Sequence, residues 1–320
     1  MKGKHSIKVR SRKIQFALEI ERNITVIRGD SATGKTTLIG MLRDYEEQGR
    51  MSGVTVECDR PCCVLSGVGW EERLQHIENS IVFADEGNAF INSEAFAHAI
   101  RESSNYYVLI TRESLYQLPY SVDAVLELRK TTSRYKRTYN RAYPYYQTLD
   151  RAGERLKTSD CILTEDSNSG YQMFSKIAEQ NGTVCAAAQG KSNILTYLLN
   201  HLNEHTLVVA DGAAFGAEME KVYKIQQLYP EQVTLYLPES FEWLLLKSGI
   251  IRSSQLQAIL DDPADTIDSA QFFSWEQFYT ALLIQLTQNS AYMAYSKQHL
   301  PTFYLQAENL KKVMETIESR

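Results

Sequence analysis

Short apolar runs alternate with longer amphipathic stretches through the first 128 residues. Runs of about five apolar residues are typical of buried strands, whereas apolar positions three and four residues apart are typical of helices. The pattern predicts strands at 13–18, 24–28, 54–58, 62–66, 80–84, 106–111 and 123–128, and helices at 35–48, 70–78, 92–102 and 113–117. This alternation favours a mainly parallel sheet covered by helices, with ligands at the carboxyl ends of the strands.

A second alternating block begins near residue 160. It predicts strands at 161–164, 183–188, 206–210 and 233–237, and helices at 170–180, 193–202 and 216–228. Beyond residue 250, apolar positions recur at helical spacing without a cluster of catalytic residue types. We therefore expect an α/β chain in four parts, which are an N-terminal domain at 1–128, a basic, tyrosine-rich linker or hairpin at 129–158, a second α/β domain at 159–250 and a helical segment at 251–320.

Composition narrows the class of protein. The 320 residues are 43% hydrophobic and 23% charged, which is typical of a globular chain long enough for two domains. The net charge of −5 excludes a global nucleic-acid signature, so any such contact must come from a local patch. Five cysteines indicate reduced thiols in a cytosol, because Cys58, Cys62 and Cys63 could form half a zinc site but no second Cys/His pair lies at ligand spacing. No apolar run is long enough for a membrane span, so we expect a cytoplasmic protein without a membrane partner.

The segment between the strand at 24–28 and the helix at 35–48 matches the phosphate-binding pattern G-x-x-x-x-G-K-[ST]. Its residues are Gly29, Asp30, Ser31, Ala32, Thr33, Gly34, Lys35 and Thr36, and Thr37 completes the nucleotide-binding set. The glycines let backbone N–H groups curl around phosphate oxygens, and the helix N-terminus adds its positive dipole. We expect Lys35 to reach the β- and γ-phosphates of ATP and Thr36 to hold Mg²⁺.

A second motif follows about 50 residues later, where the strand at 80–84 leads into Asp85 and Glu86. At the carboxyl edge of the sheet, Asp85 can bind Mg²⁺ and Glu86 can polarise an attacking water. The pair resembles that of P-loop ATPases that carry a catalytic glutamate beside the metal aspartate, a pairing that small-molecule kinases generally lack.

The strand at 106–111 ends in Thr111 and Arg112. Thr111 would lie between the two nucleotide motifs and could sense the γ-phosphate; the alternative is an ordinary strand-end threonine. Arg101 and Arg112 are candidates for a charge-stabilising arginine. The segment 65–69 is similar to the start of the signature loop of ABC-type ATPases, but too few residues separate the two nucleotide motifs for the usual helical arm, so a turn into the next helix is favoured.

Basic and aromatic residues interleave between 129 and 157. They are Lys130, Arg134, Lys136, Arg137, Arg141, Arg151, Arg155 and Lys157 among Tyr135, Tyr139, Tyr143, Tyr145 and Tyr146. Such a mixture could bind the backbone of DNA or RNA and stack on its bases. The alternative, a hairpin whose tyrosines pack on a domain while its charges face water, is favoured.

Acidic residues follow two strands of the second block: Glu165 after 161–164 and Asp211 after 206–210. Parallel strands bring both carboxylates to one edge, where mutual repulsion favours a divalent cation and metal-assisted phosphodiester chemistry. The alternative is that both acids cap the helices that follow them.

This order resembles the Toprim domain of topoisomerases, primases and overcoming-lysogenization-defect (OLD) family nucleases. Glu165, Gly190 and Asp211 match its glutamate, glycine and first aspartate, and Glu242 is similar to the extra acid of OLD-like nucleases. The match covers about residues 160–250. It departs at Ala213, where the second aspartate of Asp-x-Asp would stand; Glu218, Glu239 or Glu242 could compensate.

A P-loop ATPase joined to such a module resembles OLD-type and related anti-phage systems. The resemblance implies an ATP- and Mg²⁺-dependent enzyme that acts on nucleic acid, as a homo-oligomer or with a partner protein. The alternative is a nucleotide-gated binding or signalling protein whose second domain is inactive, as Ala213 suggests. A small-molecule phosphotransferase is a third reading, against which Glu86 argues.

Overall fold

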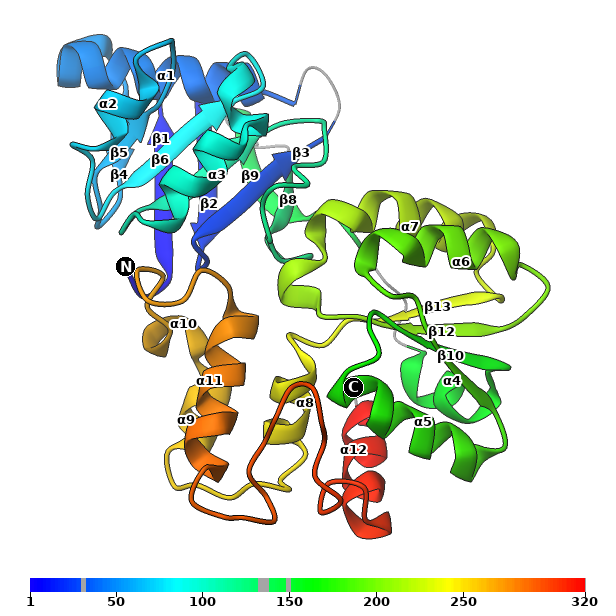
Figure 1. Ribbon diagram of the computed structural model, residues 1–320. Coiled ribbons are helices and arrows are strands. Elements are labelled where there is room, and N and C mark those ends of the chain that lie inside the picture. Colours follow the sequence, from blue (N-terminus) through cyan, green and yellow to red (C-terminus); the bar gives the residue numbers. More distant parts are fainter. Residues whose placement is uncertain (30–32, 132–137, 148–150, 320) are drawn as a thin grey trace. The chain divides into compact units, whose positions relative to one another are not determined.

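The computed structural model describes residues 1–29, 33–131, 138–147 and 151–319. The chain forms two compact units, each built from two segments (Figure 1). Unit 1 comprises Met1–Gln147 and Asp262–Ser274, and unit 2 comprises Thr148–Asp261 and Trp275–Arg320. The chain therefore passes between the units after Gln147, Asp261 and Ser274. This division differs from the expected one, because the segment predicted at 251–320 is shared between both units.

Nine strands in the described part of unit 1 form one sheet of order β4-β1-β2-β9-β8-β3-β7-β6-β5. They are β1 (His5–Arg10), β2 (Ile14–Ile20), β3 (Ile24–Arg28), β4 (Thr55–Glu57), β5 (Cys62–Val64), β6 (Ile81–Asp85), β7 (Tyr106–Ile110), β8 (Val125–Thr131) and β9 (Thr138–Pro144). The strands β8, β3, β7, β6 and β5 pair in parallel, and β2 pairs in parallel with β9. The pairs β1–β2, β1–β4 and β8–β9 are antiparallel, so the sheet is mixed rather than mainly parallel throughout.

Every side chain of β3 and β7 is buried, as expected for strands covered on both faces. The α-helices of unit 1 are α1 (Lys35–Gln48), α2 (Trp70–Leu74), α3 (Glu94–Arg101) and α10 (Pro263–Thr266). The helix predicted at 113–117 is absent. There the Thr111 hydroxyl accepts the Glu113 N–H, and Leu118 N–H bonds to the Leu115 carbonyl, so local turns replace helical hydrogen bonds.

Unit 2 contains a four-stranded parallel sheet of order β11-β10-β12-β13, which confirms the four predicted strands. Its strands are β10 (Cys161–Thr164), β11 (Val184–Ala187), β12 (Thr206–Val209) and β13 (Val233–Tyr236). Its α-helices are α4 (Ala152–Thr158), α5 (Ser169–Asn181), α6 (Ile194–Asn200), α7 (Gly216–Leu228), α8 (Phe241–Lys247), α9 (Leu256–Asp261), α11 (Trp275–Thr287) and α12 (Ala307–Glu318). From β10 the chain moves first to β11 and then to the opposite side at β12, so the strand order reverses between β10 and β12.

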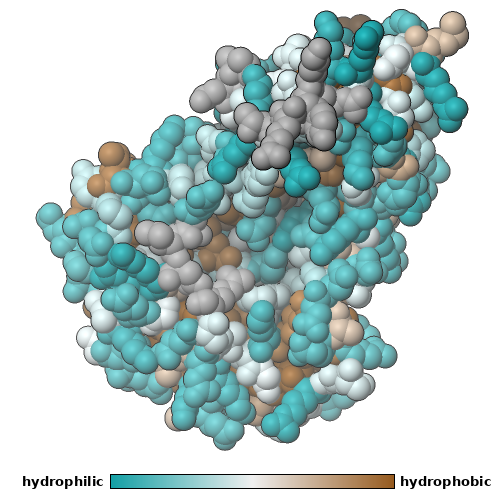
Figure 2. Space-filling view, turned by 180° about the vertical axis from the view of Figure 1, so that it is seen from behind, coloured by the Kyte–Doolittle hydropathy of each residue, from teal (hydrophilic) through white to brown (hydrophobic). Residues whose placement is uncertain are grey.

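Polar side chains dominate the face shown in Figure 2, where hydrophobic residues form scattered patches. Within the described ranges, no helix has both the length and the apolar character needed to cross a membrane.

Candidate functional site

The loop between β3 and α1 has the geometry that its two glycines allow. Gly29 and Gly34 have φ angles of 118° and 93°, in the region that favours glycine. A Cβ at Gly34 would also lie 3.1 Å from the Phe16 ring. Lys35 is buried, and its ammonium donates to the Gly29 carbonyl and, at 3.4 Å, to the Thr33 hydroxyl. Asp30, Ser31 and Ala32 lie outside the described residues.

The two nucleotide motifs follow strands on either side of β7, since β3 and β6 are its neighbours. Thr111 directly follows β7, and its N–H donates to the Ile27 carbonyl of β3 at 3.2 Å. Thr111 therefore lies at the end of the strand between β3 and β6, and its role as a γ-phosphate sensor stays a prediction. Its hydroxyl is buried and accepts the Glu113 N–H at 3.0 Å, as in an ordinary strand-end turn.

Asp85, the last residue of β6, is held by Asn88, which sequence reasoning missed. Asn88 Nδ2 donates to Asp85 Oδ1 at 2.8 Å, and Asn88 Oδ1 accepts the Gly67 N–H at 3.1 Å. The spacing Asp-x-x-Asn after a strand is the local signal that could have identified it. The bridge connects the expected magnesium ligand to the 65–69 segment.

Glu86 contacts Arg112 across the edge of the sheet. The Arg112 N–H donates to Glu86 Oε2 at 3.0 Å, and its Nε lies 3.5 Å from Oε1. Arg101, in contrast, ends α3 before β7 begins, and its guanidinium stacks 5.4 Å from the centroid of the Phe273 ring. Arg112, rather than Arg101, is therefore the arginine next to the expected nucleotide motifs.

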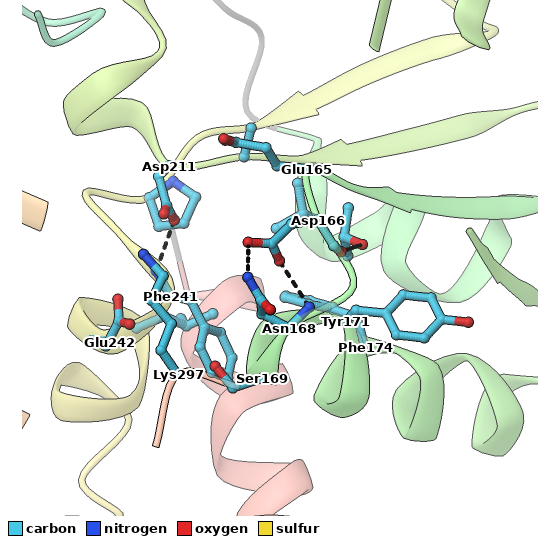
Figure 3. Close-up of a pocket in the computed structure, with 16 residues that line it drawn as sticks. Glu165, Asp166, Asn168, Ser169, Tyr171, Phe174, Asp211, Phe241, Glu242 and Lys297 are labelled. Carbon is cyan, nitrogen blue, oxygen red and sulfur yellow. Dashed lines mark hydrogen bonds between the residues drawn. The ribbon is translucent and has the colours of Figure 1, made fainter. Parts of the chain in front are cut away.

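A second group of polar residues surrounds a cavity at the carboxyl edge of the unit 2 sheet (Figure 3). Glu165 follows β10, Asp211 follows β12 and Glu242 lies in the first turn of α8. The cavity has a volume of about 50 Å³, and Asp166, Ser169 and Lys297 also line it. It lies where the strand order reverses, the usual position of ligand sites in open α/β sheets.

Glu242 is almost completely buried, with 1% of its surface exposed. Its Oε1 accepts a hydrogen bond of 2.7 Å from the Tyr295 hydroxyl, which also lies 2.7 Å from Ser169 Oγ. Its Oε2 is buried and has no hydrogen-bond partner among the described residues. A buried carboxylate oxygen of this kind is costly unless a cation or donor reaches it.

Asp211 is fixed between two segments. Its Oδ1 accepts the Phe241 N–H at 3.0 Å (Figure 3), and the next residue, Gly212, donates its N–H to the Pro238 carbonyl at 2.6 Å. Burial, together with the charges of Glu276, Glu242 and Glu165, raises the pKa of Asp211 well above its usual value. Burial also raises the pKa of Glu165. Both shifts are those expected for carboxylates that are crowded together and shielded from water.

The N-cap residues of α5 and α7, the helices that follow β10 and β12, are Asn168 and Phe215, so neither acid is the N-cap residue of the helix after its own strand. Asp211 Oδ1 accepts the N–H of Phe241, the first residue of α8, which is a capping contact with a later helix. Asp166, beside Glu165, forms the local turn by accepting the Asn168 N–H at 3.0 Å.

The C-terminal segment contributes three further polar residues to this neighbourhood: Glu276, Tyr295 and Lys297. Lys297 Nζ donates to Glu276 Oε1 at 2.7 Å. Burial alone would lower the pKa of Lys297, but Glu276, Glu242 and Asp211 raise it above its usual value. Sequence reasoning found no cluster in this segment, because its polar residues are far in sequence from the strand-end acids.

Ala213 is buried, and its N–H donates to the Glu239 carbonyl at 3.1 Å. Of the three glutamates that could replace its missing carboxylate, Glu242 lines the cavity, whereas Glu218 and Glu239 do not. As the side chains stand in the described residues, no three His, Cys, Asp or Glu residues converge to hold a metal ion. Metal binding by Glu165, Asp211 and Glu242 stays a prediction.

The basic, tyrosine-rich segment is partly a hairpin, since β8 and β9 pair antiparallel. Three closely spaced basic residues of the segment lie outside the described residues: Arg134, Lys136 and Arg137. Tyr146 is buried and accepts a hydrogen bond of 3.3 Å from Arg28, which agrees with tyrosines that pack on a domain. Arg151 and Arg155 both pair with Glu231.

Two sequence comparisons found no similar protein. The sequence matches no protein-family model, and a search of curated proteins gave no match.

Proposed function

We propose that the protein binds and hydrolyses ATP in unit 1 and that unit 2 is a metal-dependent module acting on nucleic-acid phosphodiesters. The observation that carries the proposal is the order β3-β7-β6, because Gly29 and Asp85 then lie at the carboxyl ends of two strands separated by one strand. The resemblance to OLD-type systems extends the proposal to a role in phage defence. The protein would act in the cytoplasm, as an oligomer or with a partner protein.

Each residue has a role in this proposal. Lys35 contacts the terminal phosphates, Thr36 and Asp85 hold Mg²⁺, and Glu86 orients the attacking water. Bound Mg²⁺ would neutralise charge on the phosphates. Arg112 holds the Glu86 carboxylate at the edge of the sheet until the water and nucleotide are present.

The residues of unit 2 suit a hard cation, because carboxylate oxygens are its preferred ligands. The buried, unpartnered Glu242 Oε2 is the observation that fits such an ion. Glu165, Asp211 and Glu242 would hold it, and a divalent ion at this place can activate water and stabilise a leaving oxygen.

ATP turnover by the purified protein tests the proposed ATPase activity of unit 1. We expect Lys35→Ala to remove turnover and Glu86→Gln to lower kcat by about 10²-fold or more, because a general base is lost. Glu102→Gln, at the end of α3 away from both motifs, is the matched control. Turnover that survives in both Lys35→Ala and Glu86→Gln would contradict the ATPase assignment.

Cleavage of plasmid DNA and RNA, with Mg²⁺ or Mn²⁺ and with or without ATP, tests the proposed nuclease activity of unit 2. Cutting should require the metal and should be lost in the Glu165→Ala, Asp211→Ala double variant but not in Glu315→Gln, which changes an exposed residue of α12. Intact nucleic acid under every condition would instead support the second candidate, a nucleotide-gated binding protein, which the buried Ala213 favours.

A further inference from the structure

The acidic cavity of unit 2 contains its own cation. Lys297 lines the cavity together with Glu165, Asp211 and Glu242. Its ammonium bonds to Glu276 Oε1 at 2.7 Å and interacts electrostatically with Glu242 and Asp211. Its carbonyl accepts the Ser169 N–H at 2.9 Å, which fixes the Lys297 backbone beside the first residue of α5.

Two ammonium groups act on this cluster, because Lys191, whose Nζ donates to the Ala214 carbonyl at 3.0 Å, acts on Glu165, but two are still fewer than the carboxylates. Four carboxylates, those of Glu165, Asp211, Glu242 and Glu276, act on one another or on Lys297. Crowded, partly buried carboxylates destabilise one another unless cations neutralise them. Glu242 is almost completely buried, and no hydrogen-bond donor in the described ranges reaches its Oε2.

The size of the cavity limits what could bind. Its volume of about 50 Å³ is room for a small ion with a few waters, and is too small for a nucleotide. Oxygen ligands favour Mg²⁺ or Mn²⁺ among the small divalent ions.

We propose that Lys297 is a tethered counter-cation that competes with a divalent cation for the carboxylates of Asp211 and Glu242. In the metal-free protein its ammonium supplies part of the positive charge that the carboxylates need, and Glu276 holds it at the cavity. This inference rests on the metal site of the proposed function, but it does not depend on nucleic-acid cleavage.

Lys297→Gln and Lys297→Met test the proposal, since both remove the charge and Gln keeps a donor for Glu276. We expect either variant to unfold at a lower temperature than the wild type in EDTA. Either should bind Mn²⁺ about tenfold more tightly, because a cation next to the site is gone. Mn²⁺ should therefore raise the Tm of these variants more than that of the wild type.

Lys297→Arg, which keeps the charge, should behave as the wild type, and so should Lys176→Met, which removes an exposed lysine of α5 that pairs with Glu179. Mn²⁺ binding is measured by electron paramagnetic resonance and Tm by calorimetry on the full chain. Unchanged or weaker Mn²⁺ affinity in Lys297→Gln would overturn the proposal, and so would the absence of Mn²⁺ binding in every variant. If Mn²⁺ binds as expected but nucleic acid stays intact, the nuclease assignment fails and the counter-cation stands.

Discussion

Gly212 lies where the chain leaves β12 and passes against the carbonyl oxygens of Leu237 and Pro238. A Cβ at this position would approach those oxygens to 2.8 and 2.9 Å. Both atoms belong to the backbone, so no flexible side chain can move aside. The tight passage lets the Gly212 N–H bond to Pro238 and sets Asp211 at the cavity.

We expect Gly212→Ala to destabilise unit 2 by about 1–3 kcal/mol, since the added methyl group forces the two segments apart. Gly40→Ala is the matched control, for which we expect the opposite change in stability. A Cβ at Gly40, inside α1, meets nothing within 4 Å. It should therefore stabilise unit 1 by about 0.5–1 kcal/mol. Chemical denaturation measures both, and a neutral Gly212→Ala would contradict the steric account.

Residues whose roles depend on near neighbours could be predicted from the sequence. Gly34 and Lys35 belong to one continuous motif, so the sequence predicts their place where a loop after a strand enters a helix. Lys297 and Tyr295 could not be found in the same way. Tyr295 reaches Glu242 across 53 positions and Ser169 across 126, and no local pattern encodes such pairs.

At the scale of elements, α8 depends on its first turn. The Ser240 side chain accepts the Trp243 N–H at 3.1 Å and is completely buried. This cap sets where the helix begins, and Glu242 is the second residue of that helix. Ser93 caps α3 in the same way, accepting the Phe96 N–H at 3.1 Å, but lies in unit 1.

Ser240→Ala and Ser93→Ala should each cost about 1 kcal/mol of stability, because each leaves an N–H without its acceptor. Only Ser240→Ala should also weaken Mn²⁺ binding, since it loosens the turn that presents Glu242. Urea denaturation and a Mn²⁺ titration separate the two effects. Equal Mn²⁺ affinities in the two variants would show that the α8 cap does not position the carboxylate.

Buried strands could be predicted from the sequence because most of their residues are apolar. The strands β3, β6 and β7 are short apolar runs, as are β10, β12 and β13. By contrast, β1 alternates exposed charged or polar residues with buried ones, and β9 lies in a basic, aromatic stretch that the sequence predicts as a linker or hairpin. Their partners, β2 and β8, determine their pairing, and pairing between distant strands is not visible in one sequence.

At the scale of the whole molecule, the two units carry different expected ligands. ATP with Mg²⁺ would bind the β3–α1 loop of unit 1, and Mn²⁺ would bind the cavity of unit 2. A ligand that binds only the folded form of one unit raises the stability of that unit.

We therefore expect calorimetry to resolve two unfolding transitions with separate responses. ATP should raise the Tm of one transition, and Lys35→Ala should remove that effect. Mn²⁺ should raise the Tm of the other, and Asp211→Ala should remove that effect. A single transition that both ligands raise would mean that the units unfold as one cooperative body.

The three passages of the chain between the units have a consequence for synthesis. Unit 1 needs Asp262–Ser274, whose Ala264 carbonyl accepts the Gly3 N–H at 2.9 Å and whose Phe273 carbonyl accepts Asn23 Nδ2 at 2.5 Å. A ribosome releases these residues only after all four strands of unit 2 have emerged, roughly ten seconds after β9 at ordinary rates of elongation. Unit 2 is completed later still, because it needs Trp275–Arg320, so a nascent chain holds two unfinished units until its last segments emerge.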